Sequence, residues 1–116
     1  MARRQQEKSQ ETQQELLAAA LELFQERGFF GTTIADITKK AGYAKGSFYR
    51  HWQSKDDITL QLIEAKLASC RARRTEALAR AATLEQALEA IWDFLESIME
   101  DKSWARLFLE FTIHAS

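Results

Sequence analysis

The stretch from residue 33 to residue 55 reads TIADITKKAGYAKGSFYRHWQSK, and it decides how the N-terminal half of the chain folds. Thr33 and Asp36 have the spacing of a capping box, in which each side chain bonds the backbone N–H of the other residue. Apolar residues then recur on one helical face as far as Gly42, which cannot easily continue a helix. A short helix is therefore predicted between Thr33 and Gly42.

A second short helix is predicted after this glycine, from about Lys45 to Trp52. Phe48 and Trp52 lie one helical turn apart, so both side chains can pack inward. Two short helices joined by a tight turn with a glycine form a helix-turn-helix, which lays its second helix in the major groove of DNA. The pattern therefore favours DNA binding.

The outward face of this second helix carries the candidate base contacts. A step of about 100° per residue places Gly46 and Arg50 opposite the inward aromatic pair, with Ser47 beside them. A guanidinium can pair with guanine through two hydrogen bonds, so Arg50 is the strongest candidate for reading a base. Gly46 allows close approach of the backbone, and Ser47 can donate to a base edge or a phosphate.

Groups suited to phosphate surround these residues. They are Thr33, Lys45, Tyr49, His51 and Lys55. Each also has a purely structural alternative: the threonine caps a helix in any case, the aromatic rings can pack, and the lysines can serve solubility alone. The combination, rather than any single residue, favours a phosphate-binding surface.

The distribution of charge agrees with this interpretation. The net charge is only −1, but from Lys39 to Lys55 there are basic residues and no acidic one, whereas acidic residues predominate from Thr75 to Ser116. Such asymmetry is typical of a nucleic-acid surface at one end of a protein, although a solvated basic surface would look the same.

The rest of the chain is predicted to be helical, because it contains no proline and only four glycines. A first helix is expected from a capping box at Thr12 to Gly28, preceded by a loose polar arm. Caps at Ser54 and Thr83 predict a fourth and a fifth helix, and a sixth is expected near Ser103. In the fourth helix the residues expected to face the core are Ile58, Leu62, Ile63, Leu67 and Cys70.

The predicted fold class is all-α, in three parts: a flexible basic and polar arm at 1–11, a three-helix helix-turn-helix DNA-binding domain at 12–56, and part of a helical ligand-binding and dimerisation domain at 57–116. The last predicted helix has apolar residues on more than one side and reaches Ser116 without a stop signal. We therefore expect a truncated chain, or one that covers this surface by oligomerising.

Several classes of function are disfavoured. No apolar run has the length of a secretion signal or a membrane span, so a soluble, cytoplasmic protein is expected. Cys70 is the single cysteine, and it is expected to act as a small buried hydrophobe rather than a redox sensor. The two histidines lie far apart and no nucleophile is paired with a base, so we expect no metal, no cofactor and no enzymatic activity.

The stretch from Thr33 to Lys55, together with Glu26-Arg27-Gly28-Phe29 before it, closely resembles the DNA-binding signature of the TetR family of bacterial regulators. The resemblance covers roughly residues 16–62. It implies operator contacts from Thr33, Lys45, Gly46, Ser47, Tyr49, Arg50, His51 and Lys55. Tyr43 lies in the turn, where it either packs or touches DNA.

The resemblance also implies a cytoplasmic homodimer that binds double-stranded, palindromic operator DNA, most often as a repressor, and releases it when a small-molecule effector binds the C-terminal helices. Aromatic and apolar residues there could line the effector pocket, although a stripe of this kind is more often ordinary core. The candidates are Trp92, Met99, Trp104 and Phe108. The alternative is a helical module that binds a protein rather than DNA.

Overall fold

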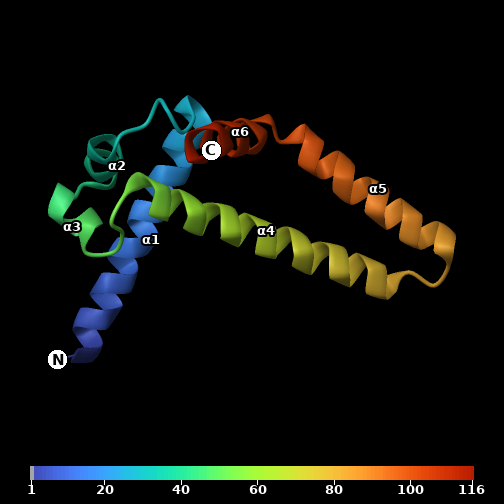
Figure 1. Cartoon of the computed structure of the whole chain (residues 1–116). Helices are drawn as coiled ribbons and strands as arrows, with labels where there is room; N and C mark the ends of the chain where they lie inside the picture. Colours follow the sequence, from blue (N-terminus) through green and yellow to red (C-terminus); the bar gives the residue numbers. More distant parts are fainter. Residues whose placement is uncertain (1) are drawn as a thin grey trace.

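The computed structural model describes residues 2–116, with side chains from residue 6 onward, and every regular element in this range is a helix. The helices are α1 (Ala2–Arg27), α2 (Ile34–Ala41), α3 (Lys45–Tyr49), α4 (Lys55–Arg80), α5 (Leu84–Glu100) and α6 (Lys102–Ala115). Figure 1 shows α2 and α3 beside α1 and α6 next to the end of α1 that leads to α2, while α4 and α5 extend away from them. The all-α prediction is confirmed.

The first helix is longer than predicted. The expected start at Thr12 is wrong: α1 already begins at Ala2, and the Thr12 hydroxyl donates to the Lys8 carbonyl at 2.8 Å, inside the helix. The segment expected to be a loose arm is therefore helical, apart from Met1, which lies outside the described residues. The physical reason is that no proline or glycine precedes Gly28, so nothing in this polar segment stops the helix.

The predicted end of this helix is confirmed. Gly28 follows Arg27 with a φ of +79°, a left-handed conformation that glycine adopts without steric cost. Its N–H donates to the Phe24 carbonyl at 2.8 Å, which closes the last turn. The Thr32 hydroxyl then donates back to the Gly28 carbonyl at 2.9 Å, so the turn that leads to α2 is held from both sides.

The capping box at α2 is present as predicted. The Asp36 N–H donates to the Thr33 hydroxyl oxygen at 3.1 Å, and the Thr33 N–H donates to the Asp36 carboxylate at 3.0 Å. Gly42 ends the helix with a φ of +83°. The next helix, α3, ends at Tyr49 rather than at the predicted Trp52, because the chain turns there to bring the Trp52 ring into the core.

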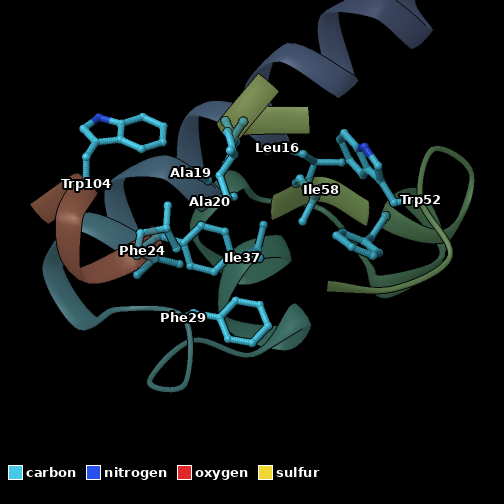
Figure 2. Packing of buried hydrophobic residues seen from close by; sticks show 14 residues of the cluster. Leu16, Ala19, Ala20, Phe24, Phe29, Ile37, Trp52, Ile58 and Trp104 are labelled. Carbon is cyan, nitrogen blue, oxygen red and sulfur yellow. The ribbon is translucent and has the colours of Figure 1, made fainter. Parts of the chain in front are cut away.

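The core joins residues from both parts of the chain. Phe24, Phe29, Ile37, Phe48 and Ile58 are almost completely buried, and Figure 2 shows Phe24 of α1, Ile37 of α2 and Ile58 of α4 among the side chains of this core. The same cluster includes Trp104 and Leu107 of α6. Helix α4 runs without a break across residue 56, where a domain boundary was predicted. The N-terminal half therefore packs directly against α6.

Helices α4 and α5 differ in how much of their apolar surface is buried. Most core positions predicted in α4 are buried, but the prediction for Leu67 is wrong, because this residue is 46% exposed. Thr83 caps α5 as predicted, and its hydroxyl accepts the Gln86 N–H at 3.1 Å. The apolar stripe of α5, however, is largely exposed: Leu84, Leu88, Ile91, Trp92, Leu95, Ile98 and Met99. Among the described residues, no helix is long and apolar enough to cross a membrane.

Candidate DNA-binding surface

The outward face of α3, which is predicted to contact DNA bases, is exposed to solvent, and the opposite face of the helix packs on buried aromatic side chains. Phe48 lies wholly inside, with its ring 5.2 Å from that of Trp52 and 5.4 Å from that of Tyr49, measured between centroids. The Trp52 indole N–H donates to the Gln61 side-chain oxygen at 2.8 Å, which ties this turn to α4. The helix is only five residues long, so these contacts, rather than its own hydrogen bonds, hold it in place.

The polar residues of the predicted site are divided by exposure. Thr33, Lys45, Gly46, Tyr49 and Arg50 are exposed, whereas Ser47, His51 and Lys55 are partly buried. Neither Lys45 nor Arg50 forms an ion pair with a carboxylate in the described part of the chain. A Cβ added at Gly46 would meet nothing within 4 Å, so the surface there is open. The exposed face of α3 thus offers cations that pair with no described carboxylate, beside an uncovered backbone.

Helix α1 contributes residues that sequence reasoning missed. A hollow of about 470 Å³ is lined by Ser47, Arg50 and His51 and, from α1, by Lys8, Ser9 and Thr12. The α1 residues were assigned to the loose arm and its edge, and so were not considered for the surface. The absence of any helix-breaking residue before Gly28 was the signal that could have found them.

Tyr43, whose role was left open, contacts α1. Its hydroxyl donates to the Glu15 carboxylate at 2.5 Å, and this hydrogen bond raises the pKa of the phenol. The ring is partly buried against the core and also lines the hollow beside α3. The contact fixes the turn between α2 and α3 to the first helix.

Thr33 is engaged in capping α2. Hydrogen bonds from Thr33 hold the pKa of the Asp36 carboxyl below its usual range, and the Arg27 guanidinium lies 3.8 Å from the same carboxylate. A negative charge therefore already occupies this helix N-terminus, which is where a phosphate was expected. The role of Thr33 in DNA binding remains a prediction.

Lys55 is not brought together with the other candidates. Its ammonium donates to the carbonyl of Phe29 at 2.7 Å and to that of Thr32 at 2.9 Å. It also lies 4.0 Å from the centre of the Phe29 ring, and desolvation lowers the pKa of the amine. The structure therefore gives Lys55 an internal role, which holds the turn between α1 and α2 to the start of α4.

The four candidate ligand-binding residues do not share one site. Trp104 and Phe108 line a cavity of about 510 Å³ between α4, α5 and α6, whereas Trp92 and Met99 do not. The latter two are 64% and 66% exposed on the outer stripe of α5. Sequence periodicity placed all four on apolar faces but could not tell which face of α5 turns inward. Cys70 is buried, as expected, in the wall of this cavity.

The three N-terminal helices, with α3 exposed, form a helix-turn-helix of the class that binds DNA, in a chain whose described elements are all helices. Residues 16–62 match the family model described as bacterial regulatory proteins, tetR family. Over these residues the chain is similar to the DNA-binding part of this family of transcriptional regulators.

Named relatives are also transcriptional regulators with a helix-turn-helix. The chain is 38% identical over 64 residues to the HTH-type transcriptional regulator AcrR of Shigella flexneri, a match that covers 55% of this chain and 30% of AcrR. It is 37% identical over 65 residues to the HTH-type transcriptional regulator TtgR of Pseudomonas putida, covering 56% of this chain and 31% of TtgR. These matches span about a third of each relative's length.

Solved structures extend the likeness beyond the first domain. The ketosteroid transcriptional regulator KstR2 of Mycobacterium tuberculosis superposes with a TM-score of 0.71 at 28% identity, covering 84% of this chain and 50% of that one. A TerR/AcrR family regulator of Aquifex aeolicus has a TM-score of 0.66 at 30% identity, covering 84% and 54% respectively. The chain thus spans about half of these structures, and the likeness includes most of α4 to α6.

Proposed function

We propose that this chain is the reading half of a ligand-responsive repressor that binds a palindromic operator as a homodimer. The observation that carries the proposal is the outward face of α3, where Lys45 and Arg50 are exposed and have no carboxylate partner among the described side chains, above a fully buried Phe48. A rigid helix with unpaired cations is suited to the major groove, because the phosphates and guanine edges there present hydrogen-bond acceptors.

In this proposal the work is divided among the residues of α3 and its neighbours. Gly46, Ser47 and Arg50 face the bases, and the phosphates are contacted by Lys45, Tyr49 and His51, with Thr33 at the start of α2. The hollow shared with α1 supports a further phosphate contact from Lys8. Lys55 is left out of the contact set, because its ammonium is already engaged by two carbonyl oxygens.

The contacts between α6 and the DNA-binding helices support ligand control. The Glu110 carboxylate accepts the Phe29 N–H at 2.8 Å, and the Arg106 guanidinium donates to the Arg27 carbonyl at 3.1 Å. His114 lies 3.0 Å from the Asp56 carboxylate at the start of α4. A shift of α6 would therefore move the end of α1 and the start of α4, so ligand binding could bias the spacing of two reading heads.

The role proposed here is regulatory rather than enzymatic, in keeping with the regulators that the chain resembles, and it is exercised in the cytoplasm, where bacterial operator DNA lies. The test is selection of bound duplexes from a random pool. Recovery of a palindrome with half-sites about one helical turn apart supports both the reading helix and the dimer. Enrichment of one unpaired half-site contradicts the dimer, and no enrichment contradicts sequence reading.

The salt dependence of binding distinguishes DNA binding from the rival function, a helical module that binds a protein. Binding through several phosphates weakens steeply as salt rises, because counterions released from DNA must be replaced. Binding at an apolar protein interface depends far less on salt. We expect a steep negative slope in a plot of log affinity against log salt concentration, and a flat plot would favour the rival.

A further inference from the structure

The cavity between α4, α5 and α6 has a chemically divided lining. The apolar part of its lining comes from Leu67 and Cys70 of α4, Phe94 and Ile98 of α5, and Trp104 and Phe108 of α6. Its volume of about 510 Å³ falls within the range of about 300–1,000 Å³ that is typical of small-molecule sites. This part of the lining suits an apolar body, because its side chains are hydrocarbon, aromatic or thiol.

The charged residues of the lining are almost all cationic. Lys66, Arg71, Arg73 and Arg74 line the cavity from α4, and the acidic residue that joins them is Asp101. Asp101 is already engaged, because its carboxylate lies 3.8 Å from the Lys66 ammonium and accepts the Ser103 hydroxyl at 2.7 Å. Within the lining, the arginines are thus left in excess.

Arg73 and Arg74 have only weak partners in the described part of the chain. The Arg73 guanidinium is 3.6 Å from the Cys70 sulfur, and that of Arg74 lies 5.8 Å from the centre of the Phe94 ring. Glu89 and Asp93 line a neighbouring hollow that shares both arginines, but no ion pair within 4.0 Å joins them. Two guanidinium groups from consecutive residues that line the same cavity can bind a carboxylate through paired hydrogen bonds.

We infer that this cavity binds a carboxylate with an extended apolar body, with the carboxylate held by Arg73 and Arg74 and the body packed against Trp104 and Phe108. The inference rests on the proposed function in one respect, since it takes this cavity to be the effector site. A neutral or cationic ligand of the same shape would gain the apolar contacts but would leave the arginines without a partner.

The test is calorimetric titration of the chain, without DNA, with decanoate, decanol and decyltrimethylammonium below their micelle-forming concentrations. We expect decanoate to bind most tightly. The double variant Arg73→Gln, Arg74→Gln should weaken decanoate binding by about ten- to hundredfold, the range expected for charge-assisted hydrogen bonds, and leave decanol unchanged. Arg80→Gln is the matched control, because Arg80 lies on the same helix but pairs with Glu76 outside the cavity.

Several outcomes would overturn the inference: equal binding of decanoate and decanol, no binding of either, or an equal loss in the Arg80→Gln control. Arg73 and Arg74 are exposed, so the double variant should keep its helix content, which circular dichroism checks. Added salt is a second readout in the unaltered chain, since it should weaken binding of decanoate but not of decanol.

The inference and the proposed function can fail separately. DNA binding is measured in a parallel titration that contains no fatty acid. If decanoate binds through the arginines while no DNA sequence is recognised, the proposed function fails and the ligand class stands. If an operator is recognised but decanoate binding does not depend on the arginines, the ligand class fails and the DNA-binding function stands.

Discussion

At the scale of single residues, Arg50 and Lys55 show how surroundings decide the use of a positive charge. The Arg50 guanidinium is exposed at the end of α3, without an ion-pair partner in the described part of the chain. Five residues later, the Lys55 ammonium is turned toward two backbone carbonyls and an aromatic ring. Arg50 is therefore available to a ligand, whereas Lys55 is used by the fold.

Replacing Arg50 by alanine is expected to reduce sequence discrimination. If Arg50 reads a guanine, the Arg50→Ala variant should lose about 1–3 kcal/mol of preference at one base position and little elsewhere. Fluorescence anisotropy with an operator and its single-base variants measures this. Lys45→Ala is the comparison, because a phosphate contact should weaken all duplexes alike. A uniform loss in Arg50→Ala would remove this residue from the base-reading set.

Replacing Lys55 by methionine is expected to destabilise the fold. The carbonyls of Phe29 and Thr32 would lose their donor, so the free energy of unfolding should fall by about 1–3 kcal/mol. Urea denaturation measures the change. The matched control is Lys45→Met, at an exposed lysine, where the expected change is below about 0.5 kcal/mol. If Lys55→Met unfolds at the same urea concentration as the unaltered chain but binds DNA with a shallower salt dependence, Lys55 is a phosphate contact after all.

At the scale of elements, short helices depend on their ends. Helix α2 has eight residues, and both of its ends are closed by local features, the Thr33–Asp36 box and the left-handed Gly42. Helix α1 ends at Arg27 and is closed locally by the Gly28 N–H, but α6 also contacts this end, through Glu110 to Phe29 and Arg106 to Arg27, 81 and 79 residues apart in the chain. Distant residues thus add to a helix end that local residues already close.

The capping box predicts a dependence on acid. The pKa of Asp36 is lowered in the folded state, so its stabilising contribution is present above the ordinary carboxyl pKa and is lost as the pH falls through the lowered value. The thermal midpoint of the unaltered chain should therefore fall more steeply than that of Asp36→Asn below about pH 4. Parallel melting curves across the acid range check this, and identical slopes would contradict it.

The two left-handed glycines predict different costs of substitution. Gly42→Ala introduces backbone strain alone, because nothing lies within 4 Å of an added Cβ. Gly28→Ala adds a clash with the Glu110 carboxylate and the Arg106 guanidinium, which must give up their contacts with the end of α1. Gly28→Ala should therefore cost about 1–2 kcal/mol more in free energy of unfolding than Gly42→Ala. Equal costs would mean that the α6 contacts add nothing to stability.

At the scale of the whole molecule, the DNA-binding helices and α6 share one core. Leu107 is completely buried in the cluster that also contains Phe24 and Phe29. The predicted boundary at residue 56 falls at the second residue of α4, inside a continuous helix. Helices α1 to α3 therefore do not pack independently of the rest of the chain.

Truncating Leu107 is expected to destabilise helices α1 to α3, although this residue lies in α6. Leu107→Ala should lower the free energy of unfolding by about 2–5 kcal/mol, the usual cost of a buried leucine. Leu109→Ala, at a 63% exposed position of the same helix, should change it little. Hydrogen exchange of the α1 and α2 amides reports whether the loss reaches the N-terminal half. Unchanged protection there would show that α6 packs without stabilising it.

The sequence by itself determined the elements whose signals are local. The Thr33–Asp36 box, the caps at Ser54 and Thr83, and the breaks at Gly28 and Gly42 were all read correctly, because capping and backbone conformation depend on residues a few positions apart. The family resemblance over residues 16–62 is likewise a property of contiguous sequence. These signals sufficed for the all-α fold and the position of α3.

The tertiary structure alone decided how those elements use their side chains. Lys55 was assigned to phosphate by its position in the chain, yet the turn between α1 and α2 folds over its ammonium. Trp92 and Trp104 both lie on apolar stripes, but packing against α4 turns only the second toward the cavity. The physical reason is that periodicity defines the faces of a helix, whereas the neighbours of each face are set by contacts between residues far apart in sequence.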